Sequence, residues 1–399
     1  MNCPLMLDDR LIDIKSVSSK TYKKLGLKYY IAPDMEYIVD ELLEVQPNEI
    51  QSYKNAANEL YEMFEKAAQH VIDNNLWEVA GIPENAIEVI THSWRNRDLH
   101  PHLYGRFDLS GVIDGKGAKL IEFNADTATV LPESVVIQRE QLLANKMDPS
   151  KQFNDTFKNV REQFKKLMAL HPDREPTILI STLGHEEDYL NADMIAQAAE
   201  RAGMETLFAE LPDVEFDPNE GIFARMKGDE YLLVDFWFKL IPWEFIAFEE
   251  PELMDILTNL VLNDKVIILN PAYTMLFQSK AMLKILWDLY PNHPLLLKTT
   301  FSGDDFRRKE AYVSKVIYGR EGSNITVFDP YGDTKEWNEG AYSKYPSVFQ
   351  AYEQLPMDED GDFYQAGVYF SGQASGLSYR RRDGYIIDED SEFIGHFIK

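Results

Sequence analysis

Apolar residues recur at helical spacing in the first part of the chain. Between residues 49 and 74 they return every three or four positions, which predicts one buried face of a helix. Asn48 stands where the N-cap of this helix would lie. Two further amphipathic segments, 130–147 and 152–169, also predict helices, and Pro132 suits a first helical turn. The apolar positions of the first helix are Ile50, Tyr53, Ala57, Leu60, Phe64, Ala67 and Val71.

The middle of the chain alternates strand and helix patterns. Residues 176–184 contain a continuous apolar run, which is typical of a buried strand. Residues 189–204 have a helical period that ends at Gly203, and residues 205–211 predict another strand. This order predicts a βαβ unit in a parallel sheet with helices on its faces. Two further strands are predicted: one begins at 231 and bends at Pro242, and the other spans 263–271.

The last third of the chain changes from long helices to short strands. Residues 279–294 predict one more helix, which Pro291 stops. After it, short alternating runs are separated by Gly, Asp and Pro, which is typical of an α+β segment. At 399 residues the chain exceeds what one hydrophobic core usually supports, so we expect subdomains at 1–150, 151–275 and 276–399.

The net charge of the chain limits the kinds of molecule that it is expected to bind. The formal charge is −27, whereas nucleic-acid binding needs Lys and Arg to neutralise phosphates. An anionic membrane surface is disfavoured for the same reason. We therefore expect no nucleic acid and no membrane as partners. Cationic small molecules are compatible with this charge.

Cysteine content and the N-terminus indicate the compartment. Cys3 is the only cysteine, so no intrachain disulfide can form and a reducing compartment is expected. The first ten residues carry acids where a signal peptide needs basic residues. No apolar run approaches the roughly 20 residues that span a bilayer. These features predict a cytoplasmic protein.

A hairpin at 104–126 carries unusual polar positions. Alternation places Arg106 and Asp108 on one face of the first strand. Glu122, Asn124 and Asp126 share one face of the second strand, and Gly115 and Gly117 mark the turn. A three-residue loop would set Asp108 opposite Asn124 and Arg106 opposite Asp126.

The chemistry of this polar face suits a hard cation. Carboxylate and amide oxygens that converge resemble the ligands of Mg²⁺ when it also holds substrate phosphates. Arg106 beside them would stabilise developing negative charge. The alternative is a solvated hairpin with an Arg–Asp cross-strand pair. Packing acids together without a cation is costly, which favours the metal site.

Five stretches, taken in order, resemble the glutathionylspermidine synthase family, whose catalytic part is an ATP-grasp ligase. The first is the hairpin YGRFDLSGVIDGKGAKLIEFNADTAT at 104–129. The others are FKLIPWE at 238–244, and the segments 270–294, 315–325 and 376–398. The resemblance implies a mixed α/β chain with an ATP-grasp fold in permuted order, in which the metal hairpin comes early and the nucleotide lid late. Residues 151–275 would be a Rossmann-like pre-ATP-grasp βαβ subdomain.

The resemblance also implies roles for single residues, with ATP and Mg²⁺ as cofactors. Arg106 and Arg380 would be catalytic, facing the transferred phosphoryl group. The Mg²⁺ ligands would be Asp108, Glu122 and Asn124. The ATP contacts would be Lys280, Lys315, Gln350, Tyr352 and Glu353. The peptide-like carboxylate substrate would meet Thr127, Thr129 and Glu244. The amidase domain of well-known family members is not expected here, because Cys3 has no catalytic context.

Several motifs have two interpretations. Gly319 and Gly322 predict a phosphate-binding lid downstream of Lys315, or else a plain β-turn. The arginines at 380–382 suit anion capture or protection of a hairpin edge.

Three other motifs suggest a metal only weakly. The histidines between 92 and 102 lack a third zinc ligand nearby. Residues 184–190 more simply cap the following helix, where acids favour the helix dipole. Residues 357–362 lack the remaining ligands of a calcium loop and predict a solvated turn.

Together these features predict an ATP-dependent carboxylate–amine ligase that forms an amide bond through an acyl phosphate. A carboxylate is a poor electrophile, so ATP would first phosphorylate it, and an amine would then displace phosphate. The expected partners are a peptide-like acid and a polyamine-like amine. Two alternatives stay open: a phosphotransferase that uses the same site, and a non-catalytic nucleotide-binding regulatory or scaffold protein.

Overall fold

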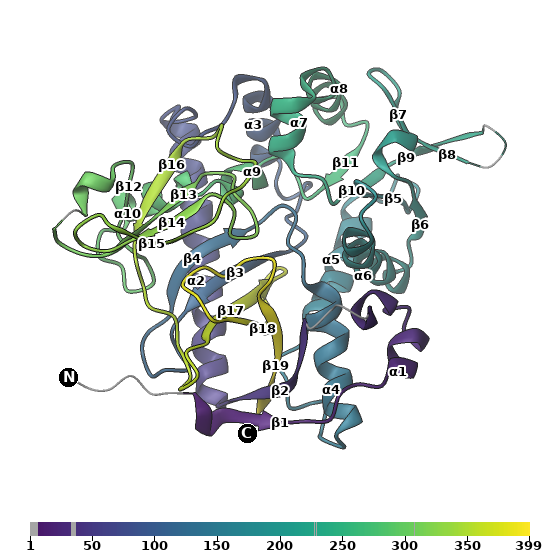
Figure 1. The fold of residues 1–399 in the computed structure, drawn as a ribbon. Helices are drawn as coiled ribbons and strands as arrows, with labels where there is room; N and C mark the ends of the chain where they lie inside the picture. Colours follow the sequence, from purple (N-terminus) through teal and green to yellow (C-terminus); the bar gives the residue numbers. More distant parts are fainter. Residues whose placement is uncertain (1–6, 33–36, 227, 229, 307) are drawn as a thin grey trace.

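The fold is described from a computed structural model (Figure 1). It covers residues 7–32, 37–226, 228, 230–306 and 308–399, and Cys3 lies outside these ranges. Within them, the strands form four sheets. The predicted mixed α/β class is confirmed.

A large sheet joins both ends of the chain. Within the described residues it has seven strands, and β19 runs parallel to β2 while the other pairs are antiparallel. Its strands in spatial order are β1 (Leu11–Asp13), β2 (Ile38–Val45), β19 (Glu392–Ile398), β18 (Ala374–Arg382), β17 (Phe363–Phe370), β3 (Gly105–Ser110) and β4 (Lys119–Asn124). The long helix α2 (Pro47–Asp73) contacts β17 and β18 of this sheet.

A parallel sheet contains the predicted βαβ unit. Its strands in spatial order are β11 (Ile267–Leu269), β10 (Phe236–Lys239), β5 (Thr177–Ser181) and β6 (Glu205–Phe208). Helix α6 (Glu186–Ala202) connects β5 to β6 and ends where Gly203 adopts φ = +109°, a conformation that favours glycine. The strand–helix–strand prediction is therefore confirmed. Helix α5 (Thr156–Leu170) packs beside α6.

Two antiparallel sheets complete the architecture. The first, here called the lid sheet, has the order β12 (Thr299–Thr300), β16 (Ser347–Ala351), β13 (Tyr312–Val316), β14 (Ile325–Phe328) and β15 (Thr334–Trp337). The second is formed by β7 (Val214–Asp217), β8 (Gly221–Arg225) and β9 (Tyr231–Val234), which project from the body in Figure 1.

The described residues also form seven shorter α-helices. They are α1 (Ser19–Lys24), α3 (Ile87–Arg95), α4 (Gln138–Ala144), α7 (Trp243–Glu249), α8 (Pro251–Leu262), α9 (Thr274–Gln278) and α10 (Ala281–Leu289). A π-helical turn, Glu133–Ile137, precedes α4. No helix among the described residues has both the length and the apolar character needed to cross a bilayer.

The predicted start of the first long helix needs a correction. The N-cap is Gln46 rather than Asn48, and Pro47 takes the first helical position. The side chain of Glu49 accepts a hydrogen bond from the backbone N–H of Gln46 at 2.8 Å. The subdomain limits near 150 and 275 stay a prediction.

Candidate functional site

The hairpin gathers its polar side chains, but in a register different from the expected one. Arg106 lies opposite Asn124, and Asp108 lies opposite Glu122. A bulge after Asp108 shifts the pairing, so the three-residue loop predicted from Gly115 to Gly117 is wrong. The polar residues still share one face, because the pairing moved by an even number of positions.

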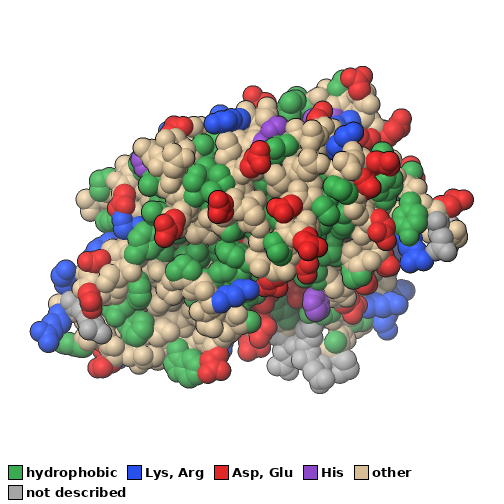
Figure 2. Space-filling view, turned by 90° about the horizontal axis from the view of Figure 1, so that it is seen from above, with side chains coloured by type: hydrophobic (Ala, Val, Ile, Leu, Met, Phe, Trp, Pro, Cys, Tyr) green, Lys and Arg blue, Asp and Glu red, His purple; other side chains and the backbone are tan. Residues whose placement is uncertain are grey.

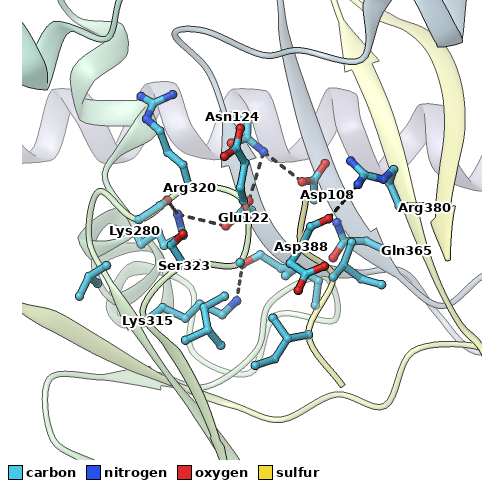
Figure 3. A pocket seen from close by; sticks show the side chains of 18 of the residues that line it. Asp108, Glu122, Asn124, Lys280, Lys315, Arg320, Ser323, Gln365, Arg380 and Asp388 are labelled. Carbon is cyan, nitrogen blue, oxygen red and sulfur yellow. Dashed lines mark hydrogen bonds and ion pairs between the residues drawn. The ribbon is translucent and has the colours of Figure 1, made fainter. Parts of the chain in front are cut away.

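The predicted metal ligands lie within hydrogen-bonding distance of one another (Figure 3). The side-chain amide of Asn124 donates to Asp108 Oδ2 at 3.0 Å and to Glu122 Oε1 at 3.3 Å. Arg106 donates to both oxygens of Asp108, from Nε at 2.6 Å and from Nη2 at 3.0 Å. Gly367 on β17 pairs with Asp108 on β3, and a Cβ atom at position 367 would lie only 2.9 Å from Arg106 Cδ. Glycine at this position therefore leaves room for the arginine.

The donor set fits a magnesium ion. A half-turn of the Asn124 amide would add its oxygen to the carboxylates of Asp108 and Glu122, and phosphate and water would supply the other ligands. Burial raises the pKa of Asp108, Arg106 opposes this rise, and Glu122 adds to it. A cation between the two carboxylates would relieve their repulsion. Among the described residues, no three His, Cys, Asp or Glu side chains gather to hold a metal by themselves.

Two lysines approach the same face from the lid side. Lys280 precedes α10 and pairs with Glu122 Oε2 at 3.1 Å, and it also donates to the carbonyl of Gly319 at 2.6 Å. Lys315, on β13, donates to Gln350 Oε1 at 2.8 Å. Burial would raise the pKa of Glu122, but the ammonium groups of Lys280 and Lys315 lower it to about 2. Glu122 is therefore ionised at neutral pH.

Lys315 should make nucleotide affinity depend on pH. Burial lowers its pKa to about 8, against the attraction of Glu122. A phosphate contact needs the ammonium form, which is present below pH 8 and lost as the pH rises through that value. We expect affinity for ATP, measured by calorimetry from pH 7 to 9.5, to fall above pH 8. Lys315→Arg stays charged and should show a flatter profile; equal slopes would exclude Lys315 as the titrating group.

The predicted lid is the loop between β13 and β14. Gly322 has φ = +70°, and a Cβ at this position would lie 2.7 Å from Asp388 Cβ. Glycine therefore lets the loop lie against the C-terminal segment. Arg320, between the two predicted lid glycines, donates to Thr127 Oγ1 at 2.7 Å and to the carboxylate of Glu244. The lid thus meets the residues expected to bind the acid substrate.

Asp126 does not belong to the polar face of the hairpin. Strand β4 ends at Asn124, so the two-residue alternation no longer applies beyond it. The carboxylate of Asp126 instead accepts from Lys239 Nζ at 3.2 Å and from the backbone N–H of Trp243 at 2.8 Å. Asp126 and Lys239 both have 0% side-chain exposure. This buried pair holds the turn that presents Thr127.

Arg380 and Thr129 line the same cavity as Arg106. Arg380 Nη2 donates to the carbonyl of Asp388 at 2.8 Å. The carbonyl of Thr129 accepts from Arg106 Nη1 at 3.1 Å and from the hydroxyl of Tyr369 at 2.7 Å. Arg106 contacts Asp108 directly, and the charge of Arg380 also opposes the rise in the pKa of Asp108.

One cavity of about 390 Å³ connects these groups. It is lined by every predicted site residue except Glu244, which contacts the lining residue Arg320. One end is apolar, where Tyr352 packs against Tyr385 with ring centroids 5.8 Å apart. The apolar lining residues that cluster with Tyr352 are Val313, Ile325, Val327 and Ile386. A volume of this size falls within the range of small-molecule sites.

Several residues that line the cavity received no role from the sequence, among them His185, Asp188 and Arg320. His185 and Asp188 come from the start of α6, in the segment interpreted as a helix cap. The acids of this segment lie in the first helical turn, as the helix-cap interpretation predicts, and one of them, Asp188, also lines the cavity. The sequence shows Arg320 as a cation between Gly319 and Gly322. It does not show the partners of Arg320, Thr127 and Glu244, because they come from distant segments.

The weak metal motifs have structural explanations. His102 is buried, stacks on Tyr61 and hydrogen-bonds the carbonyl of Ala125 through Nε2 at 2.8 Å. Asp358 accepts from the backbone N–H groups of Gly361 and Asp362, which closes the expected turn at 357–362, but Asp358 itself is buried rather than solvated.

Known proteins resemble this chain along most of its length. A putative acid–amine ligase from Haemophilus influenzae is 28% identical over 386 residues, which covers 94% of this chain and 95% of that protein. The bifunctional glutathionylspermidine synthetase/amidase of Escherichia coli is 26% identical, over 84% of this chain and 56% of its own length. Trypanothione synthetase from Crithidia fasciculata is 26% identical, over 86% of this chain and 54% of its own length. The chain thus spans little more than half of these last two relatives.

A solved structure supports the fold. The glutathione synthetase-like effector of Globodera pallida, in its apo form, has a TM-score of 0.52 and 12% identity over 90% of this chain and 89% of that chain. At this identity the likeness concerns the fold alone. The family model described as glutathionylspermidine synthase preATP-grasp matches residues 10–399. This match shows that the chain belongs to the glutathionylspermidine synthase family.

Proposed function

We propose that this protein is an ATP-dependent carboxylate–amine ligase that works through an acyl phosphate. One observation carries the proposal. A single cavity holds an oxygen cluster suited to a cation, two lysines, three arginines and an apolar end. A metal ion suits the oxygen cluster, a triphosphate suits the lysines and arginines, and adenine suits the apolar residues. The early metal hairpin and the late lid match the permuted ATP-grasp order.

The chain's own residues would divide the work of phosphoryl transfer. Lys280 and Lys315 would neutralise the phosphates, and Tyr352 and its apolar neighbours would hold the base. Asp108, Glu122 and Asn124 would hold Mg²⁺, which neutralises phosphate charge when bound. Arg106 would stabilise charge on the transferred phosphoryl group.

The acid substrate would enter between Thr127 and the lid. In the structure Arg320 bridges Thr127 and Glu244, and the Oε2 atom of Glu244 is buried without a hydrogen-bond partner among the described residues. Arg320 offers a guanidinium to the substrate's far carboxylate. Glu244 offers a carboxylate to an ammonium group of the same molecule. A peptide-like acid carries both charges.

The amine substrate would enter at the start of α6. His185 is exposed and Asp188 half-buried at the cavity wall. Burial raises the pKa of Asp188, His185 opposes the rise and Glu321 adds to it. Acidic side chains are also spread over the face shown in Figure 2. These charges would attract a polyamine-like cation.

A product screen tests the proposal. The protein is incubated with ATP, Mg²⁺, pooled short peptides and pooled polyamines, and products are identified by mass spectrometry. We expect ADP and an amide product, each dependent on both acid and amine. A stable phosphorylated product without amine would indicate the phosphotransferase, and nucleotide binding without ADP release would indicate the scaffold. Either result contradicts the proposal.

A further inference from the structure

The guanidinium of Arg380 rests on an aromatic ring from the other end of the chain. Its Cζ atom lies 5.2 Å from the ring centroid of Tyr37, within the range of a cation–π contact. Tyr37 immediately precedes β2, whereas Arg380 lies on β18. The N-terminal segment therefore reaches a residue of the cavity wall.

Backbone carbonyl groups hold two of the three guanidinium nitrogens. Nε of Arg380 donates to the carbonyl of Ser391 at 3.0 Å, and Nη2 donates to Ser391 at 2.7 Å and to Asp388 at 2.8 Å. Within the described residues, Nη1 makes no hydrogen bond. Because Arg380 lines the cavity, Nη1 is the nitrogen left for an anionic ligand.

Tyr37 is held firmly enough to act as a platform. Its carbonyl accepts from the backbone N–H of Phe393 at 2.7 Å, and Phe393 is the strand partner of Arg380. Its ring stacks on Tyr30 with centroids 6.2 Å apart and planes inclined by 21°. Burial, and then the nearby Glu133 carboxylate, raise the pKa of the Tyr37 hydroxyl. The ring stays neutral, as a cation–π partner should.

We propose that Tyr37 is a positioning residue for Arg380: its ring fixes the guanidinium so that Nη1 is presented to the transferred phosphoryl group. The inference rests on the proposed function, which places Arg380 at that group. Tyr37 touches no reacting atom, and it does not line the cavity. A donor that is already oriented stabilises developing charge without reorganising during the reaction.

Paired substitutions at position 37 test the role of the ring. Tyr37→Leu removes the ring and should lower kcat on the order of tenfold, the size of a cation–π contact, with KM for ATP nearly unchanged. Tyr37→Phe keeps the ring and should retain kcat within about twofold. Full activity in Tyr37→Leu, or an equal loss in Tyr37→Phe, would overturn the proposal.

A double-mutant cycle separates positioning from general damage. In an Arg380→Ala background, Tyr37→Leu should cause no further loss of kcat, because the residue it orients is gone. Tyr22→Leu is the matched control: Tyr22 is buried in the same hydrophobic cluster, but among the described residues its ring is in contact with neither Tyr37 nor Arg380, so its effect should be the same in both backgrounds. The same loss from Tyr37→Leu in both backgrounds would overturn the proposal.

Crystal structures of the wild type and Tyr37→Leu test positioning without turnover. We expect the Arg380 guanidinium to leave the carbonyl groups of Ser391 and Asp388 in the variant. An unmoved guanidinium would overturn the inference even in an active ligase. A displaced guanidinium in a protein that makes no amide would support the positioning role and contradict only the proposed function.

Discussion

Arg106→Ala should lower turnover on the order of a thousandfold while ATP still binds. Losses of this size follow removal of a donor that stabilises transition-state charge. Arg106 is proposed for that role because its Nη1 and Nη2 contact the carbonyl of Thr129 and the carboxylate of Asp108, at the proposed metal site. ATP affinity should persist, since Lys280 and Lys315 contact Glu122 and Gln350 and do not depend on Arg106 for their position.

Two measurements on the same preparations check this expectation. ADP release, with the acid and amine found in the product screen, gives turnover, and calorimetry gives ATP affinity. Arg139→Ala is the control, because Arg139 is 51% exposed in its pair with Glu140 and should show no change. Unchanged turnover in Arg106→Ala would remove Arg106 from the mechanism. A parallel loss of ATP affinity would make it a nucleotide-binding residue instead.

Lys239→Met should lower the free energy of unfolding by about 3–5 kcal/mol, the cost of breaking a buried ion pair. The substitution leaves the Asp126 carboxylate buried without its cation. Burial raises the pKa of Asp126, and the Lys239 ammonium opposes that rise. The remaining donors are the N–H of Trp243 and the hydroxyl of Thr274, which do not carry a full charge.

Urea denaturation measures the loss of unfolding free energy in Lys239→Met and in a variant that breaks an exposed ion pair. Lys344→Met breaks the pair with Glu249, whose side chains are 51% and 52% exposed, and should cost at most about 1 kcal/mol. Adding Asp126→Leu to Lys239→Met should recover part of the loss, because no buried charge remains unpaired. A loss in Lys239→Met no larger than in the control would contradict this role of the pair.

Local periodicity predicted much of the fold and of the site. The two-residue alternation of the hairpin put Arg106 and Asp108 on the face that Glu122 and Asn124 share. Helical spacing followed by glycine predicted the end of α6 at Gly203. These features depend on neighbouring residues, so the sequence alone is sufficient.

Other features depend on contacts between distant segments. The bulge after Asp108 moved the strand register, and the end of β4 released Asp126 toward Lys239. Arg320 meets Thr127 and Glu244 only because three separate segments converge on the lid. The spacing of residues along the chain does not reveal a contact between distant segments.

The contact between Tyr37 and Arg380 could not be predicted from the sequence either. Tyr37 reaches Arg380 because β2 pairs in parallel with β19, at the far end of the sequence. Two parallel strands that lie near opposite ends of the chain are not joined by a tight turn, so no turn motif in the sequence indicates that they pair.

A crystal structure with Mg²⁺ and a non-hydrolysable ATP analogue tests the central claim most directly. We predict a metal ion bound by Asp108, Glu122 and Asn124, phosphates between Lys280 and Lys315, and adenine at the apolar end beside Tyr352. A nucleotide bound outside this cavity, or phosphates that leave the hairpin oxygens without a metal, would contradict it.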